Sequence, residues 1–203
     1  MAKSIRMLVA GLLLFVLFSG CNFNKKKEEV VVPTSEELKR VELNKRLDRK
    51  WDDANAHYDL GKIYLADGML SQAENEFAIA MGYDPVHWDS AAAMIRTLVE
   101  SDQQSKAKIL AEDYIRRGRY SASASLLLGK AFQKEYFDKY ALTCFEQALR
   151  IAPDSAGLNK EVGFYHLSKK DNVRAVSYLR HSFEIDPRQA DVARALGKLG
   201  VTV

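Results

Sequence analysis

The sequence holds few of the residues that catalysis, metal binding or covalent cross-linking require. It has 2 cysteines and 4 histidines among 203 residues. The motifs H-E-x-x-H and G-x-S-x-G and the glycine-rich phosphate loop do not occur in it. The histidines (His57, His87, His166 and His181) are scattered along the chain. These absences favour a protein that is not an enzyme, and they predict no cofactor and no metal site.

A strong excess of one charge is also missing. There are 30 Lys and Arg residues against 27 Asp and Glu residues, which gives a formal net charge of +3. No basic stretch is interleaved with aromatic residues, as in many nucleic-acid-binding proteins. We therefore expect no nucleic-acid partner.

No apolar run is long enough to cross a bilayer, which takes about 20 residues in a helix. A shorter apolar run, residues 7–18, follows Lys3 and Arg6, and two small residues then precede Cys21. This order of charge, apolar run and small residues predicts a secretory signal over residues 1–20. The chain that remains after its removal has the length of one domain.

The segment from Phe18 to Cys21 resembles a bacterial lipobox, where a signal peptidase cuts before a cysteine that carries lipid. The resemblance implies acylation of Cys21, palmitate included, and anchoring to the exported side of a cell membrane or outer membrane. Asn22 favours the outer membrane, again by resemblance. An uncleaved anchor and conventional secretion are the alternatives. Residues 21–34 would be the lipidated cysteine and a tether of mixed charge.

Lipidation of Cys21 would leave Cys144 as the one remaining thiol. An internal disulfide is then impossible. Because Cys144 precedes Phe145 in an apolar helical pattern, we expect it to act as a small buried apolar residue.

A pattern with a period of about 34 residues, a length typical of a solenoid, runs through the rest of the chain. Gly61, Gly129 and Gly163 are each followed by the same three kinds of residue at fixed distances. Twelve positions later comes an alanine (Ala73, Ala141, Ala175), and sixteen positions later a large apolar residue (Phe77, Phe145, Leu179). Twenty-four positions later comes a proline (Pro85, Pro153, Pro187). The repeats are 54–87, 88–121, 122–155 and 156–189. The units of a solenoid must stack to bury their apolar faces.

These recurring residues resemble the tetratricopeptide repeat (TPR) over residues 54–189. The resemblance implies an all-α, right-handed solenoid of four helix-turn-helix repeats. The second repeat is degenerate, because Ile95 replaces the glycine and Arg119 replaces the proline. We expect its two helices to splay around Ile95. Simple drift and a change of curvature at a binding site both remain open as explanations.

Two helices are expected to close the solenoid at its ends. Thr34 and Glu37 match a capping box before an N-terminal helix, within residues 35–53. The apolar side of this helix is predicted to be Leu38, Val41, Leu47 and Trp51. Residues 190–203 begin a fifth repeat and then stop, which predicts a C-terminal capping helix and tail.

The resemblance also implies a concave groove lined by set positions of each first helix. On this chain those positions include Asn55, Tyr58, Lys62, Arg96, Leu126, Lys130, Lys160 and Phe164. Lys62, Arg96 and Lys130 occupy the same position in three successive repeats and predict a ladder of cations. Such a row favours an acidic or carboxylate-ended protein segment. The alternative is that long cations are merely tolerated at half-exposed positions.

A membrane-anchored, non-enzymatic adaptor for protein partners in an envelope assembly or secretion complex is the function that these features favour. Within that class the chain resembles the lipidated repeat proteins called pilotins, which serve pilus assembly. It is also similar to adaptors for peptidoglycan hydrolases and to lipoproteins of outer-membrane-protein assembly. A self-assembling structural solenoid is the alternative, since Leu199, Val201 and Val203 form an apolar C-terminus able to self-associate.

The lipid anchor yields a direct prediction. Cys21→Ser should abolish acylation and move the protein out of the membrane fraction, because the acyl chains on Cys21 are the predicted attachment to the bilayer. Metabolic labelling with a fatty acid, followed by fractionation, measures both effects. An unmodified Cys21 in the wild-type protein would refute the predicted anchor.

Overall fold

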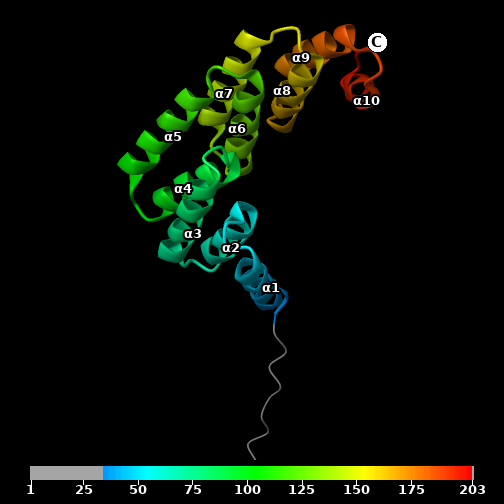
Figure 1. Ribbon diagram of the computed structural model, residues 1–203. Helices are drawn as coiled ribbons and strands as arrows, with labels where there is room; N and C mark the ends of the chain where they lie inside the picture. Colours follow the sequence, from blue (N-terminus) through cyan, green and yellow to red (C-terminus); the bar gives the residue numbers. More distant parts are fainter. Residues whose placement is uncertain (1–33, 203) are drawn as a thin grey trace, which may run out of the picture. The chain divides into compact units, whose positions relative to one another are not determined.

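The computed structural model describes residues 34–202, which belong to one unit of the chain. The predicted signal segment and Cys21 lie outside the described residues. Within 34–202 the chain is entirely helical (Figure 1). The helices are α1 (Ser35–Arg49), α2 (Ala54–Ala66), α3 (Leu70–Tyr83), α4 (Trp88–Glu100), α5 (Gln104–Gly118), α6 (Ala122–Lys134), α7 (Asp138–Ile151), α8 (Ala156–Ser168), α9 (Asn172–Ile185) and α10 (Ala190–Lys198). None of them is long and apolar enough to be a candidate membrane span.

The helices recur in the register of the sequence pattern. The first helices of successive repeats begin at residues 54, 88, 122 and 156, and α10 begins at 190. The second helices begin at residues 70, 104, 138 and 172. This register and the antiparallel pairing confirm the predicted all-α TPR solenoid, with α1 and α10 at its two ends.

The start of each repeat is set by a side chain that caps its first helix. Asp53, Ser121 and Ser155 each accept a hydrogen bond from the backbone N–H three positions later. His87 does the same in repeat two, through its ring nitrogen and the N–H of Ser90. Such caps typically contribute about 1 kcal/mol each, because they satisfy an otherwise unpaired amide. The predicted capping box of Thr34 and Glu37 is also present.

Glycine allows the two helices of a repeat to approach closely. A Cβ atom added at these glycines would lie 2.7 Å from Phe77 for Gly61, 2.6 Å from Phe145 for Gly129 and 2.7 Å from Leu179 for Gly163. These three partner side chains are at most 1% exposed. In each of these repeats, the periodic glycine therefore packs directly against the periodic large apolar residue.

Repeat two lacks this contact and is built differently. Ile95 takes the place of the glycine and is fully buried. The α4–α5 pair packs less closely than the other three pairs, as expected if Ile95 holds the helices apart. Ala107 is retained in the interior at 3% exposure.

The turn inside each repeat requires a left-handed backbone. The residues at this point are Gly68, Asp102, Tyr136 and Lys170, with φ angles of 72°, 60°, 64° and 60°. Glycine adopts this conformation freely, whereas a side chain with a Cβ is disfavoured there. Only repeat one therefore carries the residue best suited to its turn.

The N-terminal helix buries only part of the apolar side that the sequence predicts. Leu43 is 6% exposed and packs with residues of α2, whereas Leu38 and Val41 are 57% and 51% exposed. Trp51 is 68% exposed and lies edge-on to Tyr83. Leu47 packs partly buried against the same cluster, as predicted. The prediction was wrong for Leu38, Val41 and Trp51, because α1 covers one end of the stack, where only the side toward α2 is buried.

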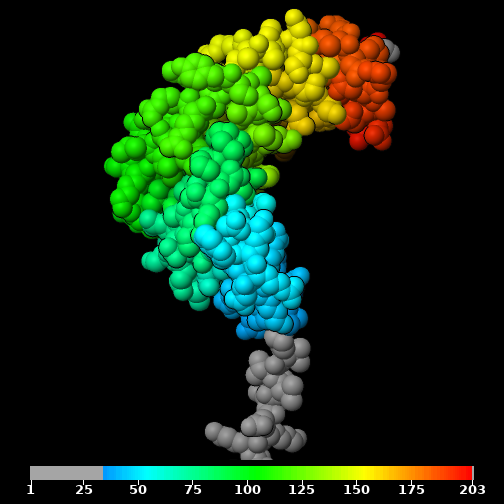
Figure 2. All heavy atoms as spheres, in the orientation of Figure 1, coloured from blue at the N-terminus to red at the C-terminus, as the bar shows by residue number. Residues whose placement is uncertain are grey.

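Within residues 34–202 the helix pairs follow a curve, with α2, α6 and α8 on its inner side and α5 and α9 on its outer side (Figures 1 and 2). The main apolar core runs between the helices of the first three repeats and reaches α8. Smaller clusters join α1 to α2 and α9 to α10. The first helices therefore supply most of the inner surface.

The glycine contact predicts opposite effects for two similar substitutions. Gly129→Ala should destabilise the fold by about 1–3 kcal/mol, because its methyl group overlaps buried Phe145. Gly82→Ala, on α3, meets nothing within 4 Å and should be neutral or stabilising by up to about 1 kcal/mol. Denaturant unfolding measures both. Equal stability of the two variants would contradict the proposed role of the glycine.

Candidate functional site: the inner face

A pocket of about 350 Å³ opens on the inner face between α2, α4 and the end of α6. We call it the inner-face pocket. Its lining consists of Tyr58, Lys62, Leu65, Ala66, Arg96, Lys134, Glu135 and Tyr136. Three cations from three different repeats thus meet two tyrosines around one hollow. This combination of charge and aromatic surface is suited to a protein segment that carries carboxylates.

Lys62 is the cation most open to an incoming carboxylate. Its Nζ lies 5.5 Å from the centre of the Tyr58 ring, in a cation–π contact. Among residues 34–202 no carboxylate lies within ion-pair distance of Lys62. Burial, with the nearby charges of Asp89 and Glu135, raises the pKa of the Tyr58 phenol. Tyr58 therefore stays protonated and keeps a hydroxyl able to donate a hydrogen bond.

The other two cations of the pocket are already paired. Arg96 Nε lies 2.7 Å from Glu100, and its Nη1 lies 3.3 Å from Glu135. The hydrogen bond that Arg96 donates to Glu100 is the main cause that raises the pKa of Arg96. Lys134 Nζ lies 2.7 Å from Asp89. A bound carboxylate would have to share or replace these acidic partners.

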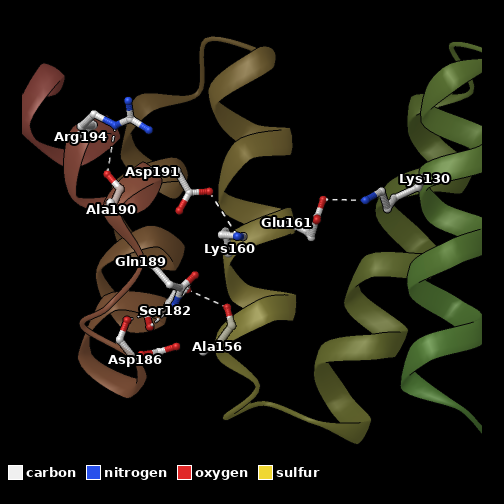
Figure 3. Close-up of polar contacts among 10 residues, drawn as sticks. All are labelled: Lys130, Ala156, Lys160, Glu161, Ser182, Asp186, Gln189, Ala190, Asp191 and Arg194. Carbon is white, nitrogen blue, oxygen red and sulfur yellow. Dashed lines mark hydrogen bonds and ion pairs between the residues drawn. The ribbon is translucent and has the colours of Figure 1, made fainter.

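Lys130, the third member of the predicted ladder, does not line this pocket. Its Nζ lies 3.0 Å from Glu161 on α8 (Figure 3). Lys160 is paired in a similar way across the next joint, 3.2 Å from Asp191 on α10 (Figure 3). These two lysines therefore bridge neighbouring repeats. The structure brings Lys62 and Arg96 together in the inner-face pocket, as predicted. The third cation of this pocket is Lys134, one helical turn beyond Lys130.

The remaining predicted groove residues are dispersed. Asn55 Oδ1 lies 3.1 Å from His87 Nε2, within hydrogen-bond distance. Leu126 packs partly buried against the main core. Phe164 lines a separate hollow of about 300 Å³ between α8 and α10, together with Arg194 and Lys198. The predicted set is thus spread over the inner face and does not form one site.

Sequence reasoning missed five residues of the pocket lining: Leu65, Ala66, Lys134, Glu135 and Tyr136. Lys134 lies four positions after Lys130, so it shares the same side of α6 and could have been found by helical spacing. Tyr136 gave no such signal, because its place follows from the left-handed turn after α6.

Two of the four histidines, His57 and His166, are buried within the repeats. Within the described part of the chain no three His, Cys, Asp or Glu side chains are grouped as metal ligands. His57 is held by Glu76 at 2.7 Å and by the carbonyl oxygen of Trp51 at 2.9 Å. His166 stacks on Tyr178, and its burial lowers its pKa.

Among known proteins, this chain shows similarity to solved structures only. No protein-family model matches the chain. No curated protein matches it. Among solved structures, YrrB, described as a TPR protein with an unusual peptide-binding site, is 20% identical over 80% of this chain and 84% of its own, with a TM-score of 0.42.

Two further solved structures are similar at the same level. TTC0263, a thermophilic TPR protein of Thermus thermophilus, is 16% identical over 79% of this chain and 88% of its own, with a TM-score of 0.44. MamA of Desulfovibrio magneticus RS-1 is 19% identical over 77% of this chain and 88% of its own, with a TM-score of 0.40. Our fold assignment rests on the repeat register and helix pairing of this chain.

The buried thiol of Cys144 gives a testable result. Cys144 is 1% exposed, and burial raises the pKa of its thiol to about 12. In the Cys21→Ser variant it should therefore resist a thiol reagent at mildly alkaline pH until the protein unfolds, since the thiolate is the reactive form. The labelling rate should follow the unfolding rate. Rapid labelling of the native protein would show an accessible thiol instead.

Proposed function

We propose that this protein is a membrane-anchored, non-enzymatic adaptor that binds an acidic or carboxylate-ended segment of a protein partner on its inner face. The observation that carries the proposal is the meeting of Lys62, Arg96 and Lys134 around Tyr58 in one pocket. The TPR fold supports a general role in protein–protein interaction.

The chemistry of the pocket favours an anionic segment over a neutral one. Lys62 offers an ammonium group and Tyr58 a hydroxyl beside it. Glu100, Glu135 and Asp89 hold the other two cations in place, so these cations are oriented before a partner arrives. The unpaired charge of Lys62 on this concave surface raises the association rate of an acidic partner, and added salt weakens this effect.

The predicted lipid on Cys21 supports a role at a membrane of the cell envelope. The tether over residues 21–34 would place the helical repeats next to that membrane on its exported side. Envelope assembly or secretion, in the manner of a pilotin, is the pathway we favour. Hydrolase adaptors, outer-membrane-protein assembly and self-assembly predict different partners, so identification of the partner distinguishes them.

Charge reversal in the inner-face pocket tests the proposal. Lys62→Glu with Lys134→Glu should reduce partner recovery by about 10-fold or more, because each lost charge-assisted hydrogen bond contributes about 1.5–3 kcal/mol. Cross-linking in the native cell, followed by purification of the tagged protein and identification of bound proteins, measures recovery.

A matched control has the same change in net charge. Lys106→Glu with Arg180→Glu alters exposed cations on α5 and α9, away from the pocket. This control should retain the partner, and thermal melts should show that both double variants fold. Undiminished recovery with the pocket variant would refute the proposed binding site.

A further inference from the structure

A second hollow, of about 590 Å³, opens where repeat two departs from the repeat pattern. We call it the joint pocket. Its apolar lining comes from α4 and α5 (Ile95, Val99, Ala107) and from the turn between α6 and α7 and the first turn of α7 (Tyr136, Phe137, Tyr140). Its polar lining consists of Gln104, Lys108, Asp138 and Lys139. The looser packing of α4 against α5 leaves this space beside Ile95.

The residues that line the joint pocket differ from those at the next joint along the chain. At the next joint, one repeat further along the chain, the corresponding residues are Gly129, Gln133, Lys170, Asp171 and Arg174. Those residues are small, polar or charged. The degenerate repeat therefore coincides with a change from a polar to an aromatic lining.

One wall of the joint pocket is aromatic. The ring centres of Phe137 and Tyr140 lie 6.1 Å apart, and both rings contact buried Phe132, at 6.3 Å and 5.3 Å. Ring edges and faces arranged at these distances favour another aromatic or large apolar group as a neighbour. The wall is fixed by the core behind it, so the space is already formed.

Tyr136 links the joint pocket to the inner-face pocket. It lines both hollows and is 79% exposed. Its φ angle of 64° lies in the left-handed region, where repeat one uses glycine. The equivalent turns of repeats two and four also carry a side chain, Asp102 and Lys170, but neither is aromatic. A partner segment lying along Tyr136 would contact both hollows.

We propose that the joint pocket receives a large apolar side chain, aromatic by preference, from the same acidic segment that the inner face binds. This inference rests on the proposed function and names a second feature of its partner. Lys139 has no carboxylate within ion-pair distance among residues 34–202, and Asp138 is paired with Lys169 at 2.6 Å. The edge of the joint pocket thus also favours acidic residues beside the apolar one.

Selection from a random peptide library displayed on phage, with the purified full chain as bait, tests this inference. The selected peptides should be acidic and should share one Phe, Trp, Tyr or Leu. Replacing that residue by Ala in a synthetic peptide should weaken binding about 10- to 100-fold, since burying such a side chain contributes about 1.5–3 kcal/mol. Fluorescence polarisation measures the affinities.

Two variants locate the effect in the joint pocket. Gln104→Trp places a bulky ring in the lining from an exposed position, and Tyr136→Gly removes the shared ring at a turn that suits glycine. In both variants, replacing the apolar residue of the peptide by Ala should weaken binding by only about twofold or less. Ser105→Trp, at an exposed neighbour of Gln104, is the control for the first variant. Lys170→Gly, at the equivalent turn of repeat four, is the control for the second. Both controls should keep the full 10- to 100-fold loss of affinity when the apolar peptide residue is replaced by Ala.

The outcomes separate the two proposals. Selected peptides that are acidic but share no apolar residue would refute binding at the joint pocket. So would an affinity loss on the Ala replacement that is unchanged in Gln104→Trp and Tyr136→Gly. Either result would leave the proposed inner-face site intact. Selected peptides with no acidic preference would overturn the proposed function itself, and with it this inference. Thermal melts of all four variants confirm that each is folded.

Discussion

The close approach of two helices at a glycine is the contact on which the rest of this structure depends. In three repeats the missing side chain on the first helix admits Phe77, Phe145 or Leu179 from the second. The helices then pair tightly, and the start of each pair recurs every 34 residues along the chain. Where Ile95 replaces the glycine, the pair opens and an aromatic-walled hollow appears beside it. One substitution thus connects the packing of the repeat to the joint pocket.

The inner face combines two kinds of charge. Lys130 with Glu161, and Lys160 with Asp191, bridge successive first helices and support the stack. Lys62 has no such partner among the described residues and lies beside a half-buried tyrosine. Paired surface ions contribute little to stability, about 0–1 kcal/mol each, so their main effect is to orient neighbouring groups. Binding specificity would then depend on the few cations that remain accessible, and the aromatic hollow next to them would select a mixed acidic and apolar partner.

The sequence predicted the architecture well and the site only in part. The period, the helix pairs and the role of Ile95 follow from residue spacing, because backbone geometry repeats with the sequence. The choice between Lys130 and Lys134 depends on where acidic neighbours lie across a joint, and spacing within one helix does not show this. On α1 the prediction held for Leu47 and was wrong for Leu38 and Val41, because no neighbouring helix covers those two. Tyr136 could not be foreseen, because no residue preference marks its left-handed turn.

Hydrogen-exchange mass spectrometry of the full chain, with and without the partner recovered by cross-linking, tests most directly whether the inner face is the binding surface. The account predicts slower exchange at the end of α2, at the end of α4 and from the end of α6 through the turn at Tyr136, with α9 unchanged. Slower exchange confined to the outer helices α5 and α9 would contradict it.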